Sequence, residues 1–345
     1  MAQAPQNFST GLVLGKFYPL TRGHQYLIET ARGRSRTLYV AVGSRPGETI
    51  PPEVRARWIR ELYPDVRVVV QPNTLPYFPE ECPTPHEFYT IWARALQEVC
   101  DGRSPDALFT SEDYGDITAG YLGCIHVMVD RARAHVPICA TKVRENPFAC
   151  WEFLDPVVQR YFTKTVCVIG PESTGKSTLC ADLAAHFNTV WQPEWARDHL
   201  GERHCEYEDM EIIVRGHFGE HPAYKAKANK ILFMDTDAIT TWAFSEHYYQ
   251  RVPAFVREMA ERMHEFVGLY LFTDIDVPWV ADTSRDLGEP WQREAMKRIL
   301  LAHLERRGLP FVMISGTWEQ RRRRAIQAVE DRVLRRSKGQ GSAES

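Results

Sequence analysis

The sequence predicts an α/β protein built from two doubly wound parallel-sheet domains. The chain has 345 residues, which is more than one ordinary hydrophobic core holds. Short apolar runs alternate with helical patterns in the first half, and the second half repeats this alternation, as expected for parallel strands joined by helical crossovers. We place the domains at residues 1–155 and 163–336, with the boundary near 156–163, and expect a disordered tail at 337–345.

Five apolar runs predict the strands of the first domain, and the patterns between them predict its helices. The predicted strands are residues 11–14, 38–42, 66–70, 107–109 and 125–129. Helical patterns cover residues 25–31, 52–62 and 87–99.

The second domain shows the same two signals. Strand-like runs cover residues 166–169, 231–234, 269–272 and 311–314, and a shorter run lies at 189–191. Helical stretches begin at Lys176, Pro253, Trp291 and Trp318. Proline suits the first turn of a helix because its fixed φ angle is helical and its missing N–H is not needed there.

The composition excludes several classes of function. Lys and Arg number 42 against 45 Asp and Glu, so the formal net charge is only -3, too weak a field to draw the chain onto nucleic acid or an anionic membrane. No stretch approaches the about 18 to 20 apolar residues of a membrane span. We therefore expect a cytoplasmic protein with no nucleic-acid or membrane partner, and the eight cysteines to be reduced. The sequence leaves the oligomeric state open, a homo-oligomer included.

The strongest motif lies at the start of the second domain. Gly170 to Ser177 reads GPESTGKS, which matches the phosphate-binding loop between a strand and a helix. Glycines let the main chain curl so that successive N–H groups point at phosphates, the lysine reaches the β and γ oxygens, and the hydroxyl binds Mg²⁺. The predicted ATP-binding residues here are Gly170, Glu172, Ser173, Thr174, Gly175, Lys176, Ser177 and Thr178.

Carboxylates near predicted strand ends complete a phosphoryl-transfer site. Asp235 and Asp237 follow the strand at 231–234, and Asp235 is the better metal ligand beside Ser177. Glu194, in PEWAR, is a second candidate for the general base, and the spacing does not choose between Glu194 and Asp235. Trp195 and Arg197, with Asp237, are candidates for binding an aromatic substrate.

Two arginine-containing segments receive opposite interpretations. Residues 282–288, DTSRDLG, have the polar composition of a lid, and Arg285 is a candidate for stabilising transition-state charge. The run Arg321 to Arg324 lies on a helix that also carries acidic residues, so we expect it to be a solvated face.

The first domain carries two further turns suited to phosphates. Gly15 to His24 reads GKFYPLTRGH between the first strand and the first helix, where His24 can donate to a phosphoryl oxygen. Thr141, Lys142 and Arg144 lie within one turn at a later helix start. Two separated polyphosphate sites in one sheet suggest cleavage of ATP with pyrophosphate leaving.

These two segments resemble the signatures of the nucleotidylyltransferase superfamily. Residues 10–335 as a whole resemble the NadR-type family of nicotinamide-mononucleotide adenylyltransferases and ribosylnicotinamide kinases. The resemblance also includes TSEDYG at 110–115, NPF at 146–148 with Trp151, the GPESTGKS loop, PEWAR, DTDAITT at 235–241 and PWVADTSRDLG at 278–288. It implies a Rossmann-like nucleotidylyltransferase domain followed by a P-loop kinase domain.

The resemblance implies roles for residues of the first domain. His24 would stabilise the transferred α-phosphoryl group, Lys16 and Arg144 the β and γ phosphates, and Thr141 the phosphate tail. Trp92 would stack on nicotinamide. The remaining ATP-binding residues implied in this turn are Gly15, Phe17, Thr21 and Gly23.

The chain departs from the family pattern at two positions. Thr21 stands where family members commonly carry His, and Cys139 where they commonly carry Ser. We expect Thr21 to face the triphosphate as a neutral donor, so that Thr21→His would raise the rate of adenylyl transfer. Because about ten residues precede the first strand, we expect no N-terminal DNA-binding domain.

The leading hypothesis is an NAD⁺ salvage enzyme. Its second domain would phosphorylate nicotinamide riboside with Mg²⁺ and ATP, and its first domain would adenylylate the nicotinamide mononucleotide (NMN) so formed to NAD⁺. One alternative is a coenzyme A synthase-like adenylyltransferase and kinase. A second alternative is a nucleotide-sensing regulator with little turnover.

Overall fold

The computed structural model describes residues 7–72, 74–201, 203–278 and 289–335. The chain divides into two compact units, Met1–Tyr161 and Phe162–Ser345. The two units are hereafter called unit 1 and unit 2. The expected lid at 282–288, with Arg285, and the tail at 337–345 lie outside the described residues.

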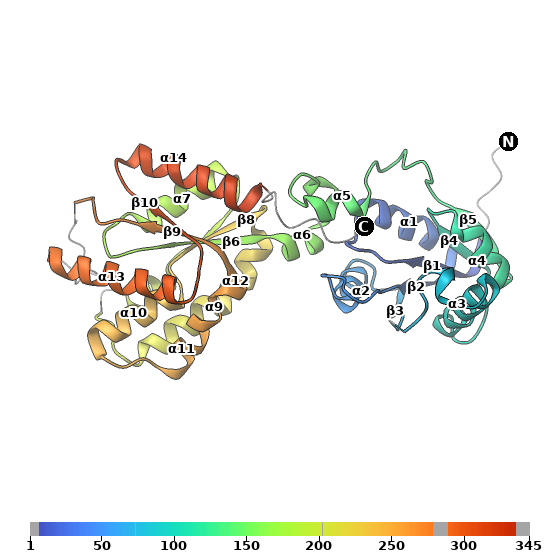
Figure 1. Cartoon of the computed structure of the whole chain (residues 1–345), viewed down its shortest axis with the longest axis horizontal. Coiled ribbons are helices and arrows are strands. Elements are labelled where there is room, and N and C mark those ends of the chain that lie inside the picture. Colours follow the sequence, from blue (N-terminus) through green and yellow to red (C-terminus); the bar gives the residue numbers. More distant parts are fainter. Residues whose placement is uncertain (1–6, 73, 202, 279–288, 336–345) are drawn as a thin grey trace. The chain divides into compact units, whose positions relative to one another are not determined.

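Unit 1 is a parallel five-stranded sheet flanked by helices (Figure 1). The strand order is β3-β2-β1-β4-β5, so the chain leaves the central strand β1 toward one edge and then returns to build the other. The strands are β1 Phe8–Gly15, β2 Ser35–Val42, β3 Arg67–Val70, β4 Ala107–Thr110 and β5 Ile125–Met128. The helices are α1 Arg22–Arg32, α2 Pro52–Leu62, α3 Pro85–Val99, α4 Tyr114–Leu122, α5 Ala140–Glu145 and α6 Pro156–Phe162, which reaches the boundary.

Unit 2 is a second parallel sheet, with strand order β10-β9-β6-β8-β7. Its strands are β6 Lys164–Ile169, β7 Trp191–Gln192, β8 Ile231–Asp235, β9 Val267–Thr273 and β10 Phe311–Ile314. Its helices are α7 Lys176–His186, α8 Trp195–Leu200, α9 Asp209–Lys227, α10 Ala238–Tyr249, α11 Ala254–Glu261, α12 Met263–Phe266, α13 Pro290–Arg306 and α14 Trp318–Val329.

Alternation of side chains along β6 builds two cores in unit 2. Val166 and Val168 pack with α7 and α14 on one face of the sheet, whereas Cys167 and Ile169 pack with α9, α10, α11 and α13 on the other. Figure 1 shows the two helical layers on opposite sides of the strands. Burial on both faces explains the nearly continuous apolar runs of the sequence. The predicted fold class, two doubly wound parallel-sheet domains, is therefore confirmed.

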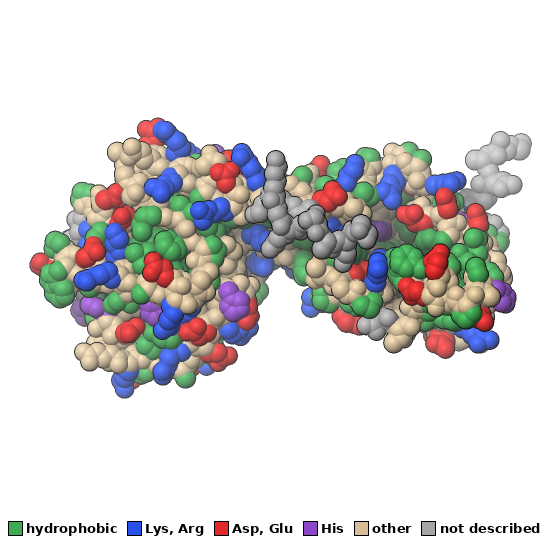
Figure 2. Space-filling view, viewed as in Figure 1, with side chains coloured by type: hydrophobic (Ala, Val, Ile, Leu, Met, Phe, Trp, Pro, Cys, Tyr) green, Lys and Arg blue, Asp and Glu red, His purple; other side chains and the backbone are tan. Residues whose placement is uncertain are grey.

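The surface agrees with the near-neutral composition. Figure 2 shows basic and acidic side chains mixed over the visible face of each unit, without a large region of one sign. Among the described residues, no helix is both long enough and apolar enough to cross a membrane. All eight cysteines are free thiols.

Candidate functional sites

The phosphate-binding loop of unit 2 joins β6 to α7 in a conformation that needs its glycines. Gly170 has a φ angle of 156° and Gly175 one of 83°, and a side chain at Gly170 would meet the Thr273 hydroxyl at 2.4 Å. The Lys176 ammonium donates to the Pro171 carbonyl at 3.0 Å, which holds it over the loop. The loop and the first turn of α7 thus present a cation and main-chain N–H groups to an anion.

Ser177 and Asp235 are brought together from α7 and the end of β8. The Ser177 hydroxyl donates to Asp235 Oδ2 at 2.6 Å. Asp235 is 1% exposed, and its Oδ1 is buried without a hydrogen-bond partner among the described residues. Burial, followed by the nearby charge of Glu194, raises the pKa of Asp235 to about 6. A carboxylate short of partners beside a hydroxyl fits an oxygen-ligated divalent cation.

Glu194 has a different environment from Asp235. It immediately precedes α8, and its carboxylate lies 3.6 Å from the Arg197 guanidinium, with the Glu194 side chain 27% exposed and that of Arg197 49% exposed. Glu194 remains accessible, whereas Asp235 is committed to Ser177. The structure therefore gives different environments to the two carboxylates between which the spacing did not choose a general base.

Asp237 was expected to bind substrate, but the fold uses its carboxylate as a helix cap. One oxygen accepts from the N–H groups of Ile239 and Thr240 at 3.0 and 3.2 Å, and the other accepts from the Tyr270 hydroxyl at 2.7 Å. The residue is 3% exposed. Asp237 lines the cavity of unit 2, but both of its oxygens already have partners, so a direct contact with substrate is not supported.

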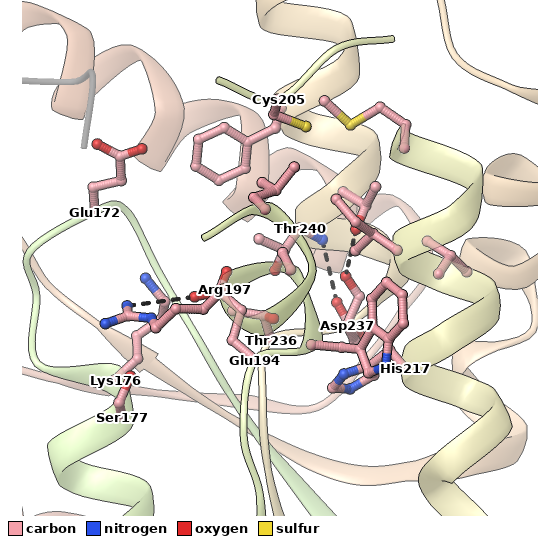
Figure 3. Close-up of a pocket in the computed structure, with 18 of the residues that line it drawn as sticks. Glu172, Lys176, Ser177, Glu194, Arg197, Cys205, His217, Thr236, Asp237 and Thr240 are labelled. Carbon is pink, nitrogen blue, oxygen red and sulfur yellow. Dashed lines mark hydrogen bonds and ion pairs between the residues drawn. The ribbon is translucent and has the colours of Figure 1, made fainter. Parts of the chain in front are cut away.

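A cavity of about 510 Å³ extends from the phosphate-binding loop into unit 2. Figure 3 shows Lys176 and Ser177 on one side of it and Asp237 and His217 on the other. The walls away from the loop are rich in aromatic side chains, namely Trp195, Phe218, Phe244, Tyr248 and Tyr249. Such faces suit a flat ring and favour a cationic one.

Trp195 is held in this wall by three contacts. Its ring stacks on His199 with the centroids 4.9 Å apart, and its indole N–H donates to Glu220 at 3.1 Å. A side chain at Gly216 of α9 would lie 2.2 Å from the same ring. Trp195 therefore lines the cavity, with its position fixed by α9.

Sequence reasoning missed the part of this wall that α9 and α10 supply. Met210, Val214 and His217 line the cavity and follow an i, i+4, i+7 spacing that identifies one face of a helix. Polar residues interrupt that stripe, and Pro222 lies within the helix, so the signal was weak. Thr240 and Phe244 of α10 complete this part of the wall.

In unit 1, the turn after β1 fixes the orientation of His24. The Thr21 N–H donates to His24 Nδ1 at 3.1 Å, so Nδ1 is an acceptor and the ring proton resides on Nε2. Burial, with the charge of Arg133, lowers the pKa of His24 to about 4. His24 keeps part of its surface exposed. It is therefore a neutral imidazole that can donate one hydrogen bond from Nε2.

Two neighbours of His24 were expected to bind ATP and have their side chains buried instead. Thr21 is 2% exposed, and its hydroxyl lies 3.0 Å from His24 Nδ1. The expectation that it faces the triphosphate is therefore wrong. Phe17 is fully buried and packs edge-on against His24, with the ring centroids 5.3 Å apart. Both side chains support the imidazole.

Arg144 connects the two signatures of unit 1. Its guanidinium donates to the Tyr18 carbonyl at 2.7 Å and to the Thr141 hydroxyl at 3.0 Å. Lys16 lies on the same turn, 3.3 Å from Glu48 and 4.2 Å from the centre of the Tyr77 ring. The fold thus joins the cations at Lys16 and Arg144 to the turn that carries His24.

Trp92 is half-buried and anchored through its indole N–H, and Arg321 differs from its sequence-based interpretation. The Trp92 indole donates to the Pro76 carbonyl at 2.8 Å and packs against the core of unit 1, so its N–H anchors a loop. Arg321 is 1% exposed, which contradicts a solvated face at that position. Arg322, Arg323 and Arg324 are not buried.

The chain is similar to characterised proteins over nearly its whole length. A family model described as an AAA domain matches residues 165–321. The "Trifunctional NAD biosynthesis/regulator protein NadR" of Escherichia coli (strain K12) is 32% identical over 94% of this chain and 84% of its own length. The protein of the same name from Salmonella typhimurium (strain LT2) is 32% identical over 93% of this chain and 82% of its own.

Two solved structures share the fold. The crystal structure of NadR protein in complex with NAD and AMP-PNP has a TM-score of 0.75 and 24% identity, covering 97% of this chain and 99% of that one. NadR protein in complex with NR gives a TM-score of 0.76 and 23% identity, covering 98% and 100%.

The Thr21 contact generates a prediction opposite to the one made from sequence. We expect Thr21→His to lower the rate of nucleotidyl transfer by unit 1, because a buried site fitted to threonine has no room for a second imidazole. Thr21→Ser keeps the hydroxyl and should stay within a few-fold of wild type. Steady-state rates of both variants from about pH 6 to 8, where imidazole titrates, test this. A faster Thr21→His protein would contradict it.

A second prediction concerns the contact between Gly216 and Trp195. Gly216→Ala should raise the KM for the flat substrate of unit 2 and leave the KM for ATP unchanged, because the new methyl group displaces the Trp195 ring. Alanine favours a helix by about 1 kcal/mol over glycine, so unit 2 should not lose stability through α9 itself. Gly219→Ala, where the added methyl group would meet nothing within 4 Å, is the matched control. Equal KM values in the two variants would show that Trp195 does not line the substrate site.

Proposed function

The chain belongs to the NadR family of NAD biosynthesis proteins, and we propose that its two units catalyse successive ATP-dependent steps of NAD⁺ salvage. Unit 2 phosphorylates nicotinamide riboside, and unit 1 adenylylates the resulting mononucleotide. The observation that carries this proposal is a strand-to-helix turn suited to phosphates in each unit, with an aromatic-lined cavity beside the loop of unit 2.

In unit 2 the 5′-hydroxyl of the nucleoside attacks the γ-phosphorus of ATP. A new O–P bond forms, the bond between the γ-phosphorus and the bridging oxygen breaks, and ADP leaves. We assign Glu194 as the group that accepts the hydroxyl proton, because it is accessible at the cavity while Asp235 is bound to Ser177. Lys176 neutralises charge on the transferring group. Nicotinamide riboside carries a cationic ring, which suits the aromatic wall.

Ser177 and Asp235 are the residues that fit Mg²⁺. Both offer oxygen ligands, and the unpartnered Asp235 Oδ1 is the orphaned buried atom expected where an ion completes a site. Ser177 and Asp235 would hold the ion, which would offset the negative charge of the ATP phosphates. A nearby cation favours the charged form of a carboxylate, so we expect a bound Mg²⁺ to lower the raised pKa of Asp235.

In unit 1 the phosphate of the mononucleotide attacks the α-phosphorus of a second ATP, and pyrophosphate leaves. No protein nucleophile is needed when the reacting groups are held in line. His24 donates from Nε2 to the α-phosphoryl oxygens, while Lys16 and Arg144 hold the departing phosphates. The alternative, a regulator with little turnover, would use these residues only to bind nucleotides. Turnover measurements distinguish this regulator from the proposed enzyme.

Lys176→Ala tests the independence of the two sites. We expect it to abolish formation of NMN from nicotinamide riboside and to leave adenylylation of added mononucleotide within a few-fold of wild type, because Lys176 belongs to the loop of unit 2. Product identification by mass after incubation with Mg-ATP measures both reactions. Loss of both activities in a folded variant would contradict two separate sites.

His24→Ala tests the role of the imidazole. Adenylyl transfer should fall by about 10²-fold or more, as for removal of one preorganised donor to a developing anion, and the kinase reaction should survive. Because the pKa of His24 is lowered to about 4, its neutral form should support a rate without a His24 titration between about pH 6 and 8, the range of an ordinary imidazole. A near wild-type rate in His24→Ala would identify His24 as a structural cap.

A further inference from the structure

Arg321 is a buried cation that the proposed chemistry does not use. It lies on α14, is 1% exposed, and ranks with Arg55 among the largest fully buried side chains. Ala325 and Ala328 of the same helix are also buried, so Arg321 occupies the core-facing stripe. Burying a guanidinium is costly unless its donors are matched, so its partners indicate its role.

The Arg321 guanidinium joins three loops that follow neighbouring strands. One terminal nitrogen donates to the Thr174 carbonyl of the phosphate-binding loop at 3.0 Å. The other donates to the Asp274 carbonyl after β9 at 2.8 Å and pairs with the Asp276 carboxylate. Its Nε donates to the Gly316 carbonyl after β10 at 3.0 Å.

The contact with Thr174 fixes the direction of a phosphate-binding group. In a trans peptide the C=O and the following N–H lie in one plane and point in opposite directions. Holding the Thr174 carbonyl toward Arg321 therefore turns the Gly175 N–H away from Arg321, on the side where Lys176 begins α7. The φ angle of 83° at Gly175 allows that peptide to be oriented in this way at little cost.

Neighbouring hydrogen bonds also hold the peptide between Thr174 and Gly175 in place. The Thr174 hydroxyl donates to the Pro171 carbonyl at 2.8 Å and lies 2.7 Å from the Thr273 hydroxyl. Asp276, besides pairing with Arg321, accepts from the Gly316 N–H at 2.5 Å. The planar fork of arginine satisfies three carbonyls and one carboxylate together, which a lysine ammonium does not reproduce.

We propose that Arg321 is a positioning residue for ATP in unit 2, setting the direction of the Gly175 N–H toward the phosphates. It does not touch the reacting atoms. This role rests on the proposed kinase function of unit 2, because it concerns ATP bound at the same loop. It goes further by naming a residue of the last helix as a determinant of ATP affinity.

Arg321→Lys tests the proposal in the full chain. We expect the KM for ATP in the kinase reaction to rise about tenfold or more, the scale of a small misplacement of a binding group, with the KM for the nucleoside and adenylyl transfer by unit 1 unchanged. Arg323→Lys is the matched control, because Arg323 of the same helix pairs with the exposed Glu319 at 3.0 Å. A lowered melting temperature with an unchanged KM for ATP would show that Arg321 is merely structural.

Equilibrium binding separates this proposal from the kinase assignment. Titration with AMP-PNP should reveal a Lys176-dependent site, identified by its loss in Lys176→Ala, and Arg321→Lys should weaken that site alone by about tenfold. This result supports the role of Arg321 whether or not nicotinamide riboside is phosphorylated. Should Arg321→Lys fail to fold, Asp276→Ala replaces a partner whose side chain is 38% exposed. It should weaken the same site, and unchanged binding in it would overturn the proposal.

Discussion

Parallel strand pairing is the constraint on which both units depend. Because every strand of a parallel sheet runs in the same direction, all the loops that follow strands meet at one edge. In unit 2 this places the phosphate-binding loop after β6 and Glu194 after β7 around one cavity, and Asp235 at the end of β8 beside Ser177 of that loop. In unit 1 the same strand direction places the turn that leads to His24 directly after the central strand β1. Strand order therefore brings the candidate site residues to one edge of each sheet.

The fold and the phosphate-binding loops were predictable because they rest on local patterns. Strands buried on both faces appear as apolar runs in the sequence. Gly170 and Gly175 occupy positions whose φ angles favour glycine. Roles that depend on tertiary partners were not predictable. Arg321 looks like Arg322 to Arg324 in sequence, and its burial against three carbonyls and the Asp276 carboxylate distinguishes it. Thr21 looked like a ligand because the sequence does not show which way a side chain points.

Asp235 and Asp237 illustrate how two similar residues at a strand end acquire different tasks. Asp235 ends β8 and meets Ser177, whereas Asp237 lies beyond Thr236, which has a left-handed φ of 64°, and turns back to cap α10. Asp235 keeps one carboxylate oxygen without a hydrogen-bond partner among the described residues, whereas both oxygens of Asp237 accept hydrogen bonds. The number of protein donors around each group therefore determines its role better than its distance from the loop.

The hydrogen bond from the Thr21 N–H to His24 affects how charge is distributed in unit 1. In the proposed reaction, a neutral His24 would direct a hydrogen bond to a phosphoryl oxygen without supplying a positive charge. In the proposed reaction, the charge that develops as pyrophosphate separates would therefore be balanced by Lys16 and Arg144, which lie beside the same turn. Geometry and charge compensation would then come from different side chains, and because the pKa of His24 is lowered to about 4, the direction of its N–H would not change with pH near neutrality.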